Sequence, residues 1–139
     1  MFGRCLNLLT DEQIWWRPNS ESNSIGNLLL HLSGNARQWI VCGVGGAADA
    51  RDRDAEFARR EMIPREELRL LMKQTLREVD AALAQFNPDN LTETRTIQGL
   101  DVSVLEAILH VVEHFSMHVG QIVYITKHLT AHDLHFYDL

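Results

Sequence analysis

Apolar residues recur every three to four positions along most of this chain, which is the pattern of helices that bury one face. The clearest example follows Ser24 and comprises Ile25, Leu28, Leu29, Leu32, Ala36, Trp39 and Ile40. Ser24 is a suitable N-cap residue, and the glycines of the GVGG segment at 43–46 are suited to end the helix. The period therefore predicts a long amphipathic helix between Ser24 and this segment.

Two further long helices are predicted from the same signals. Pro64 is suited to the first turn of one helix, which ends at the NPDN segment of residues 87–90. Asp101 or Ser103 is suited to cap the longest helix, which is expected from about residue 104 to 129. Loops join these helices, and the helices are expected to pack against one another in a bundle.

The remaining segments predict smaller elements. Residues 1–9 are expected to form a short first helix, and Thr10 or Asp11 could cap one further turn. Residues 92–101, TETRTIQGLD, are expected to form a turn or a strand fragment. The chain is therefore predicted to be an all-α protein, an antiparallel four-helix bundle with a short first helix, in a single domain over residues 1–139.

Charge and composition exclude several classes of function. The formal net charge is −6 and Lys and Arg form no cluster, so nucleic-acid binding is not expected. No apolar run reaches the ~20 residues that cross a bilayer, and the N-terminus lacks a secretory signal, so a cytoplasmic protein is expected. Cys5 and Cys42 are expected to be free thiols. The alternating charges of residues 51–61 predict a solvated loop or helix face.

The predicted last helix carries three histidines one turn apart, at positions 110, 114 and 118. On a helical wheel His114 and His118 lie at the edge of the apolar face, whereas His110 points towards solvent and Glu113 lies on the polar side. A buried imidazole needs a partner for each ring nitrogen. The His114–His118 pair could bind a metal ion, or the two residues could be hydrogen-bonded core or surface residues.

His31 favours the metal hypothesis because it lies in the middle of the most hydrophobic predicted helix. A single histidine there could be a hydrogen-bonded core residue. If His31 faces His114 and His118, the three side chains supply three imidazole ligands and leave a coordination position open, as in catalytic sites. Phe115 stands where an HExxH metalloprotease has its glutamate, so that class is excluded. The other histidines, His110, His128, His132 and His135, are not expected to bind the metal.

Three stretches of the chain resemble the DinB-like superfamily of bacterial helical proteins, in particular the small branch of unknown function related to YfiT-like proteins. They are residues 11–40, residues 51–60 (RDRDAEFARR) and residues 110–138, which include the HxGQ motif at His118–Gln121. The resemblance implies a four-helix bundle, often a homodimer, that binds a divalent metal such as zinc or nickel through His31, His114 and His118. The first helix is shorter here than is usual in that superfamily.

The resemblance also implies a class of reaction, because characterised relatives include transferases and isomerases that use a low-molecular-weight thiol, and others are described as metal-dependent hydrolases. The expected partner is therefore a small-molecule substrate, together with a small thiol if the reaction is thiol transfer. The residues identify no general base; Asn35 and Gln121 are expected to hydrogen-bond to the metal ligands. The alternative is a non-enzymatic metal-binding or stress-response protein with a structural or vestigial site.

A homodimer is expected from the residues as well. The short first helix is expected to cover the core poorly. Trp15, Trp16 and Trp39 add a large aromatic area that is hard to bury in a bundle of this size. Exposed apolar surface of this kind marks interfaces, and two-fold pairing is the commonest way to cover it.

Overall fold

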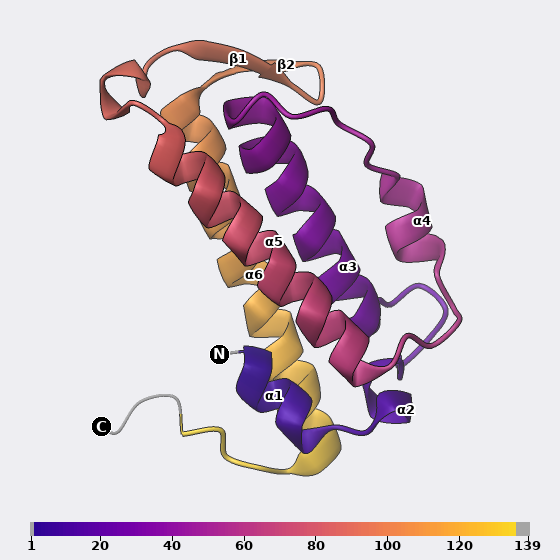
Figure 1. Cartoon of the computed structure of the whole chain (residues 1–139). Helices are drawn as coiled ribbons and strands as arrows, with labels where there is room; N and C mark the ends of the chain where they lie inside the picture. Colours follow the sequence, from indigo (N-terminus) through magenta and orange to yellow (C-terminus); the bar gives the residue numbers. More distant parts are fainter. Residues whose placement is uncertain (1, 136–139) are drawn as a thin grey trace.

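Helices make up most of the protein in the computed structural model, which describes residues 2–135 (Figure 1). The longest elements are α3 (Ile25–Ala36), which continues into the π-helix η1 (Arg37–Val44), α5 (Arg65–Gln85) and α6 (Val104–Thr130). Both α3 and η1 pack against α5 and against α6. The prediction of a helical bundle is therefore confirmed.

The predicted helix starts are confirmed by their capping interactions. The Ser24 hydroxyl accepts a hydrogen bond from the Asn27 backbone N–H, and the Asn27 side-chain oxygen accepts one from the Ser24 backbone N–H. Ser103 and Glu106 form the same reciprocal pair at the start of α6. These pairs satisfy backbone N–H groups that have no partner within the helix. At the other end of η1, Gly45 caps the helix and Gly46 has φ of 78°, as the GVGG segment predicted.

A β-hairpin forms where a turn or a strand fragment was predicted. Strand β1 (Thr94–Ile97) pairs antiparallel with β2 (Leu100–Ser103). The two-residue turn between them has positive φ at both Gln98 and Gly99, which matches the right-handed twist of the strands. The hairpin lies at one end of the bundle, where β1 packs on η1 (Figure 1). Gly43 permits this contact, because a Cβ atom there would overlap the Ile97 side chain.

Six α-helices are found in the described part of the chain, because two short helices precede α3 and a third lies between η1 and α5. Helix α1 (Phe2–Leu8) buries Cys5 and Leu6 and packs against α6. The one-turn helix α2 (Asp11–Ile14) is capped by Thr10, as expected. Helix α4 (Arg53–Ala58) packs on α3, and the 3₁₀ turn η2 (Pro88–Asn90) follows α5. Both cysteines are free thiols.

The expectation that the tryptophans would be hard to bury is wrong for two of them. Trp39 is 3% exposed, and Trp15 is 7% exposed. The Trp15 indole donates a hydrogen bond to the Ile63 carbonyl at 3.0 Å and lies against Gly26, where no side chain intervenes. The loop that contains Ile63 thus supplies the hydrogen-bond acceptor that allows the Trp15 indole to be buried. No helix within residues 2–135 is both long and apolar enough to span a membrane.

The core consists of two apolar clusters along the bundle, and Phe115 of α6 packs against both. One cluster contains Leu28 and Leu32 of α3, and the other contains Ala36 and the η1 residues that follow it. The turns of α3 and α6 that carry histidines lie where the two clusters meet. Polar side chains at this level are therefore held between two well-packed regions.

Candidate metal centre

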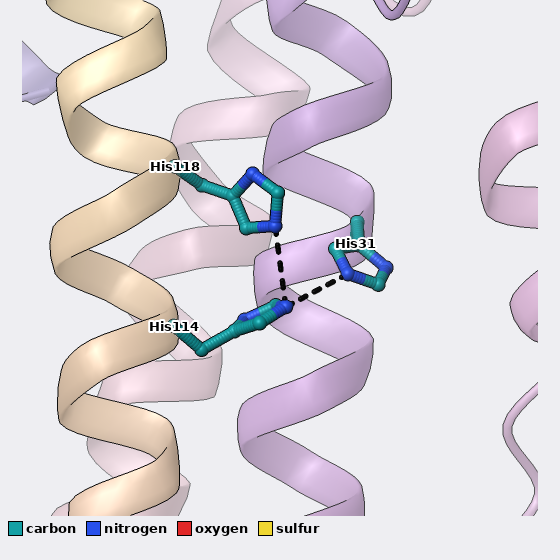
Figure 2. Close-up of side chains that lie close together, drawn as sticks. All are labelled: His31, His114 and His118. Carbon is teal, nitrogen blue, oxygen red and sulfur yellow. Dashed lines mark hydrogen bonds between the residues drawn. The ribbon is translucent and has the colours of Figure 1, made fainter.

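Three histidines from two helices point their rings into the space between α3 and α6 (Figure 2). His31 comes from α3, and His114 and His118 come from adjacent turns of α6. The Nε2 atom of His114 lies 2.9 Å from Nε2 of His31 and 3.2 Å from Nε2 of His118. The structure thus brings together the three residues that the sequence singled out.

Burial keeps the His114 and His118 imidazoles in the neutral form that binds metal ions. His31 and His118 are buried and His114 is half-buried. Burial, together with the neighbouring histidines and Arg51, lowers the pKa of His114 to about 3. Burial also lowers the pKa of His118. An unprotonated Nε2 carries the lone pair that a metal ion requires, and at neutral pH these two rings have it available.

The Nδ1 side of His31 is fixed by a carboxylate. His31 Nδ1 donates to Glu56 Oε2 at 2.9 Å, which leaves the lone pair of His31 on Nε2. Arg51 donates two hydrogen bonds, of 2.7 and 2.8 Å, to the same carboxylate. Arg51 Nη2 also lies 3.1 Å from His31 Nδ1, but a nitrogen that donates to Glu56 cannot accept from Arg51. A carboxylate, a histidine and a metal ion form the arrangement that orients ligands in many metal sites.

The electrostatics of Glu56 favour its charged form. Burial raises the pKa of the carboxyl group, but the hydrogen bonds from Arg51 and His31 outweigh this effect and leave the pKa below its usual value. A carboxylate held in this way is already engaged on both oxygens. Glu56 is therefore suited to orient His31 rather than to accept a proton from a substrate.

The expectation that residues 51–61 form a solvated loop or helix face is wrong for Arg51 and Glu56. Their side chains are only 4% and 10% exposed, although most of this stretch is exposed. Asn27 holds the segment against α3, because its side-chain amide donates to the backbone carbonyls of Glu56 and Arg59. Gly34 supplies the space, since a Cβ atom there would overlap the Glu56 carboxylate. A glycine one turn after His31 in an apolar helix was the sequence signal that a side chain lies close by.

The two predicted hydrogen-bonding residues behave differently. Gln121 contacts a member of the cluster, because its Oε1 lies 2.7 Å from His118 Nδ1 and accepts a hydrogen bond from the Nδ1–H group. Asn35 does not: its side chain lies 3.2 Å from Nε2 of His110. Asn35 lies in the last turn of α3, two residues before the π-helix η1 begins at Arg37.

The remaining histidines lie outside the cluster, as expected, but the expectation that His110 faces solvent is wrong. His110 is half-buried and stacks on Trp39 with 3.9 Å between ring centroids. His128 is exposed and lies beside the Trp16 ring, and His132 and His135 are exposed. Glu113 is exposed, as the helical wheel predicted.

The donor set fits a divalent transition metal. Two imidazole nitrogens bound at 2.0–2.1 Å in tetrahedral geometry lie about 3.3 Å apart. The two short Nε2 separations, 2.9 and 3.2 Å, are close to this value. Phe57 packs on the His31 ring with 4.4 Å between centroids and shields one side of the cluster from water. The three histidines are thus placed so that they could hold one metal ion.

The fold and the histidine cluster together define a helical-bundle protein with three histidines that could hold a metal ion. The chain belongs to the family described as "Protein of unknown function (DUF1572)", whose model matches residues 1–138. A crystal structure of a DinB-like protein from Bacillus cereus is similar to this one, with a TM-score of 0.71 and 13% sequence identity. The match covers 92% of this chain and 83% of the other. Comparison with curated proteins finds no match.

Proposed function

We propose that this protein binds one divalent metal ion, zinc or nickel, through the Nε2 atoms of His31, His114 and His118, and that it is an enzyme. The observation that carries the proposal is the convergence of these three nitrogens, with the Nδ1 atoms of His31 and His118 turned outwards to Glu56 and Gln121. Three protein ligands leave at least one coordination position for a substrate or water, which is the arrangement of catalytic sites.

The reaction that fits best is a transferase reaction in which a small thiol is the nucleophile and an unidentified small molecule is the acceptor. Hydrolysis, with water as the nucleophile, is the second choice. A divalent metal bound here would lower the pKa of water or of a thiol towards neutrality and so supply a nucleophile. Glu56 is paired with Arg51 and His31, so it is poorly placed to act as a general base. A thiol ionises more easily than water, and thiol transfer therefore depends less on a protein base.

Cobalt substitution tests both parts of the proposal. The visible spectrum of a protein with one bound Co²⁺ per chain reports coordination number, and a thiolate ligand adds a sulfur-to-cobalt absorption band in the near ultraviolet. We expect 2-mercaptoethanol to produce this band without removing the metal, as checked by metal analysis after gel filtration. A spectrum that thiols and anions leave unchanged would indicate a closed site and would support the alternative, a non-enzymatic metal-binding or stress-response protein.

Chelation is expected to remove the metal without unfolding the protein. The apolar clusters along the long helices are buried independently of the histidines, unlike in a zinc finger, whose fold depends on its metal. Protein treated with a chelator should keep its helical circular dichroism at room temperature. Loss of that signal would mean that the site is structural and would count against the enzyme proposal.

We also propose that α1, α3, α5 and α6 correspond to an antiparallel four-helix arrangement and that the chain forms a homodimer. Apolar side chains on one face of α6 support the dimer, since Leu105, Leu109 and Val112 are 45%, 51% and 60% exposed. Helix α1 is too short to cover this face as well as the part of α6 that it contacts. Light scattering at micromolar concentration should give twice the 15.9 kDa of one chain, and a mass of one chain would refute the dimer.

A further inference from the structure

A groove of about 780 Å³ lies between the segment that follows α2 and the second half of α6. This volume is in the range of small-molecule sites. Its walls are mainly apolar and aromatic, and include Trp16, Leu28, Met117 and Tyr124. The ring of His128 lies beside Trp16, with 5.6 Å between centroids. Aromatic and thioether side chains of this kind adapt to the flat body of an organic molecule.

The groove is lined by residues that are close in sequence to the histidine cluster on both helices, although none of the three histidines lines it. Leu28 precedes His31 by three residues, and Met117 follows His114 by three, so these lining residues are neighbours of the cluster on their helix surfaces. Gln121 links the two sites, because it lines the groove and its Oε1 accepts a hydrogen bond from His118 Nδ1–H. Its amide NH₂ group is the part that can donate to a molecule in the groove.

Gly120 keeps this part of α6 open. Glycine is among the least favourable residues in the interior of a helix, so its position in the middle of α6 calls for a physical reason. Close packing is not that reason, because a Cβ atom at Gly120 would meet none of the described residues within 4 Å. Gly34, by contrast, is packed against Glu56. The missing side chain at Gly120 enlarges the groove. The Gly and Gln of the HxGQ motif therefore both form part of the groove wall.

The charged residues that line the groove indicate whether it is suited to a cation or to an anion. Among the described residues that line it, Glu21 is the one acidic side chain, and none is Lys or Arg. Ser20 donates to Glu21 Oε1 at 3.2 Å. A carboxylate next to Trp16 and Tyr124 favours a cation over an anion, because the faces of aromatic rings also attract positive charge.

We propose that this groove binds a small molecule with an aromatic body and a positively charged amine, as the substrate that reaches the histidine cluster past Gln121. The role of this molecule as a substrate rests on the proposed function, whereas its binding does not. Because no Lys or Arg of the described chain lines the groove, the groove is poorly suited to a carboxylate-bearing thiol, and such a thiol would approach the metal site by another route.

The test compares three probes of similar size: 2-phenylethylamine, 2-phenylethanol and phenylacetate. Their affinities are measured by calorimetry and ligand-observed NMR on the full chain, both zinc-loaded and metal-free. We expect the amine to bind most tightly and the acid most weakly. Glu21→Gln should reduce the preference for the amine over the alcohol by about two- to fivefold, the range for an exposed charge. Equal affinity for the amine and the acid in the unmodified protein would overturn the proposal.

Gly120→Leu is the decisive variant, because leucine is a better helix former than glycine and should fill the groove without unfolding α6. Binding of the amine should be lost, while helical circular dichroism and zinc stoichiometry should be retained. Ser116→Leu, one turn earlier on the exposed surface of α6 and outside the groove, is the matched control and should bind normally. Undiminished binding by Gly120→Leu would refute the groove as the site.

Two further outcomes are distinguishable. If the metal-free chain binds the amine but no zinc binds to the histidines, the proposed metal-dependent function is refuted. The proposal that the groove binds an aromatic amine still stands. If Gly120→Leu changes a dimer into a monomer and the unmodified protein does not bind the amine, a second copy of the chain covers the groove and this proposal is overturned.

Discussion

Replacing His118 with alanine is expected to abolish stoichiometric metal binding. His118 supplies one of the three converging Nε2 atoms, and no other described side chain of the cluster lies within reach to replace it. Two imidazoles on separate helices leave the metal with a weaker and less rigid donor set. Metal analysis of protein purified without a histidine tag should fall from about one equivalent per chain to a small fraction of one.

The control for this experiment is His110→Ala. His110 lies on the same helix, stacks on Trp39 and is half-buried, so its replacement also disturbs packing along α6. It is not one of the three converging residues, and the variant should retain the metal. Equal loss of metal in both variants would refute the assignment of ligands and would indicate that packing, not coordination, was changed.

The spacing of histidines and the resemblance to the DinB-like superfamily together predicted the cluster. The spacing contributed because a helix converts sequence distance into direction. His114 and His118 had to share one face of α6, and His31 had to lie on the buried face of the helix that follows Ser24. The same reasoning failed for His110, which is near the boundary of the apolar face. There the large Trp39 ring covers a position that a helical wheel, which considers one helix alone, assigns to solvent.

Arg51 and Glu56 were not predicted because their burial depends on tertiary contacts. An alternating run of charges is usually solvated, and nothing in its local pattern distinguishes two buried members from the exposed ones. They are buried because Asn27 anchors the segment and Gly34 leaves a space beside His31. The β-hairpin was foreseen only as a turn or strand fragment for a similar reason: the close approach of Ile97 depends on Gly43 of a different element.

Glu56→Gln is expected to weaken metal binding about 10- to 100-fold, the usual effect of removing a hydrogen-bonding partner of a metal ligand. Glutamine has nearly the same shape, but its neutral oxygen is a weaker acceptor for His31 Nδ1–H. His31 is then a less basic ligand and its ring is held less firmly. Competition with a chromophoric chelator measures the change in affinity. Glu61→Gln is the matched control, because Glu61 lies in the same charged stretch with its side chain 91% exposed.

A double variant separates the two ways in which Glu56 can act. Besides orienting His31, the carboxylate neutralises Arg51, whose positive charge lies next to the site and opposes a cation. If neutralisation were the whole effect, removing the charge in Arg51→Gln together with Glu56→Gln would restore metal affinity. If Glu56 acts through His31, the metal affinity of the double variant should remain about as low as that of Glu56→Gln alone, because Nδ1 still lacks its carboxylate.

We expect the double variant to keep this low affinity, since the 2.9 Å hydrogen bond to His31 is retained only when Glu56 is present. Full recovery in the double variant would contradict the role of Glu56 in orienting His31.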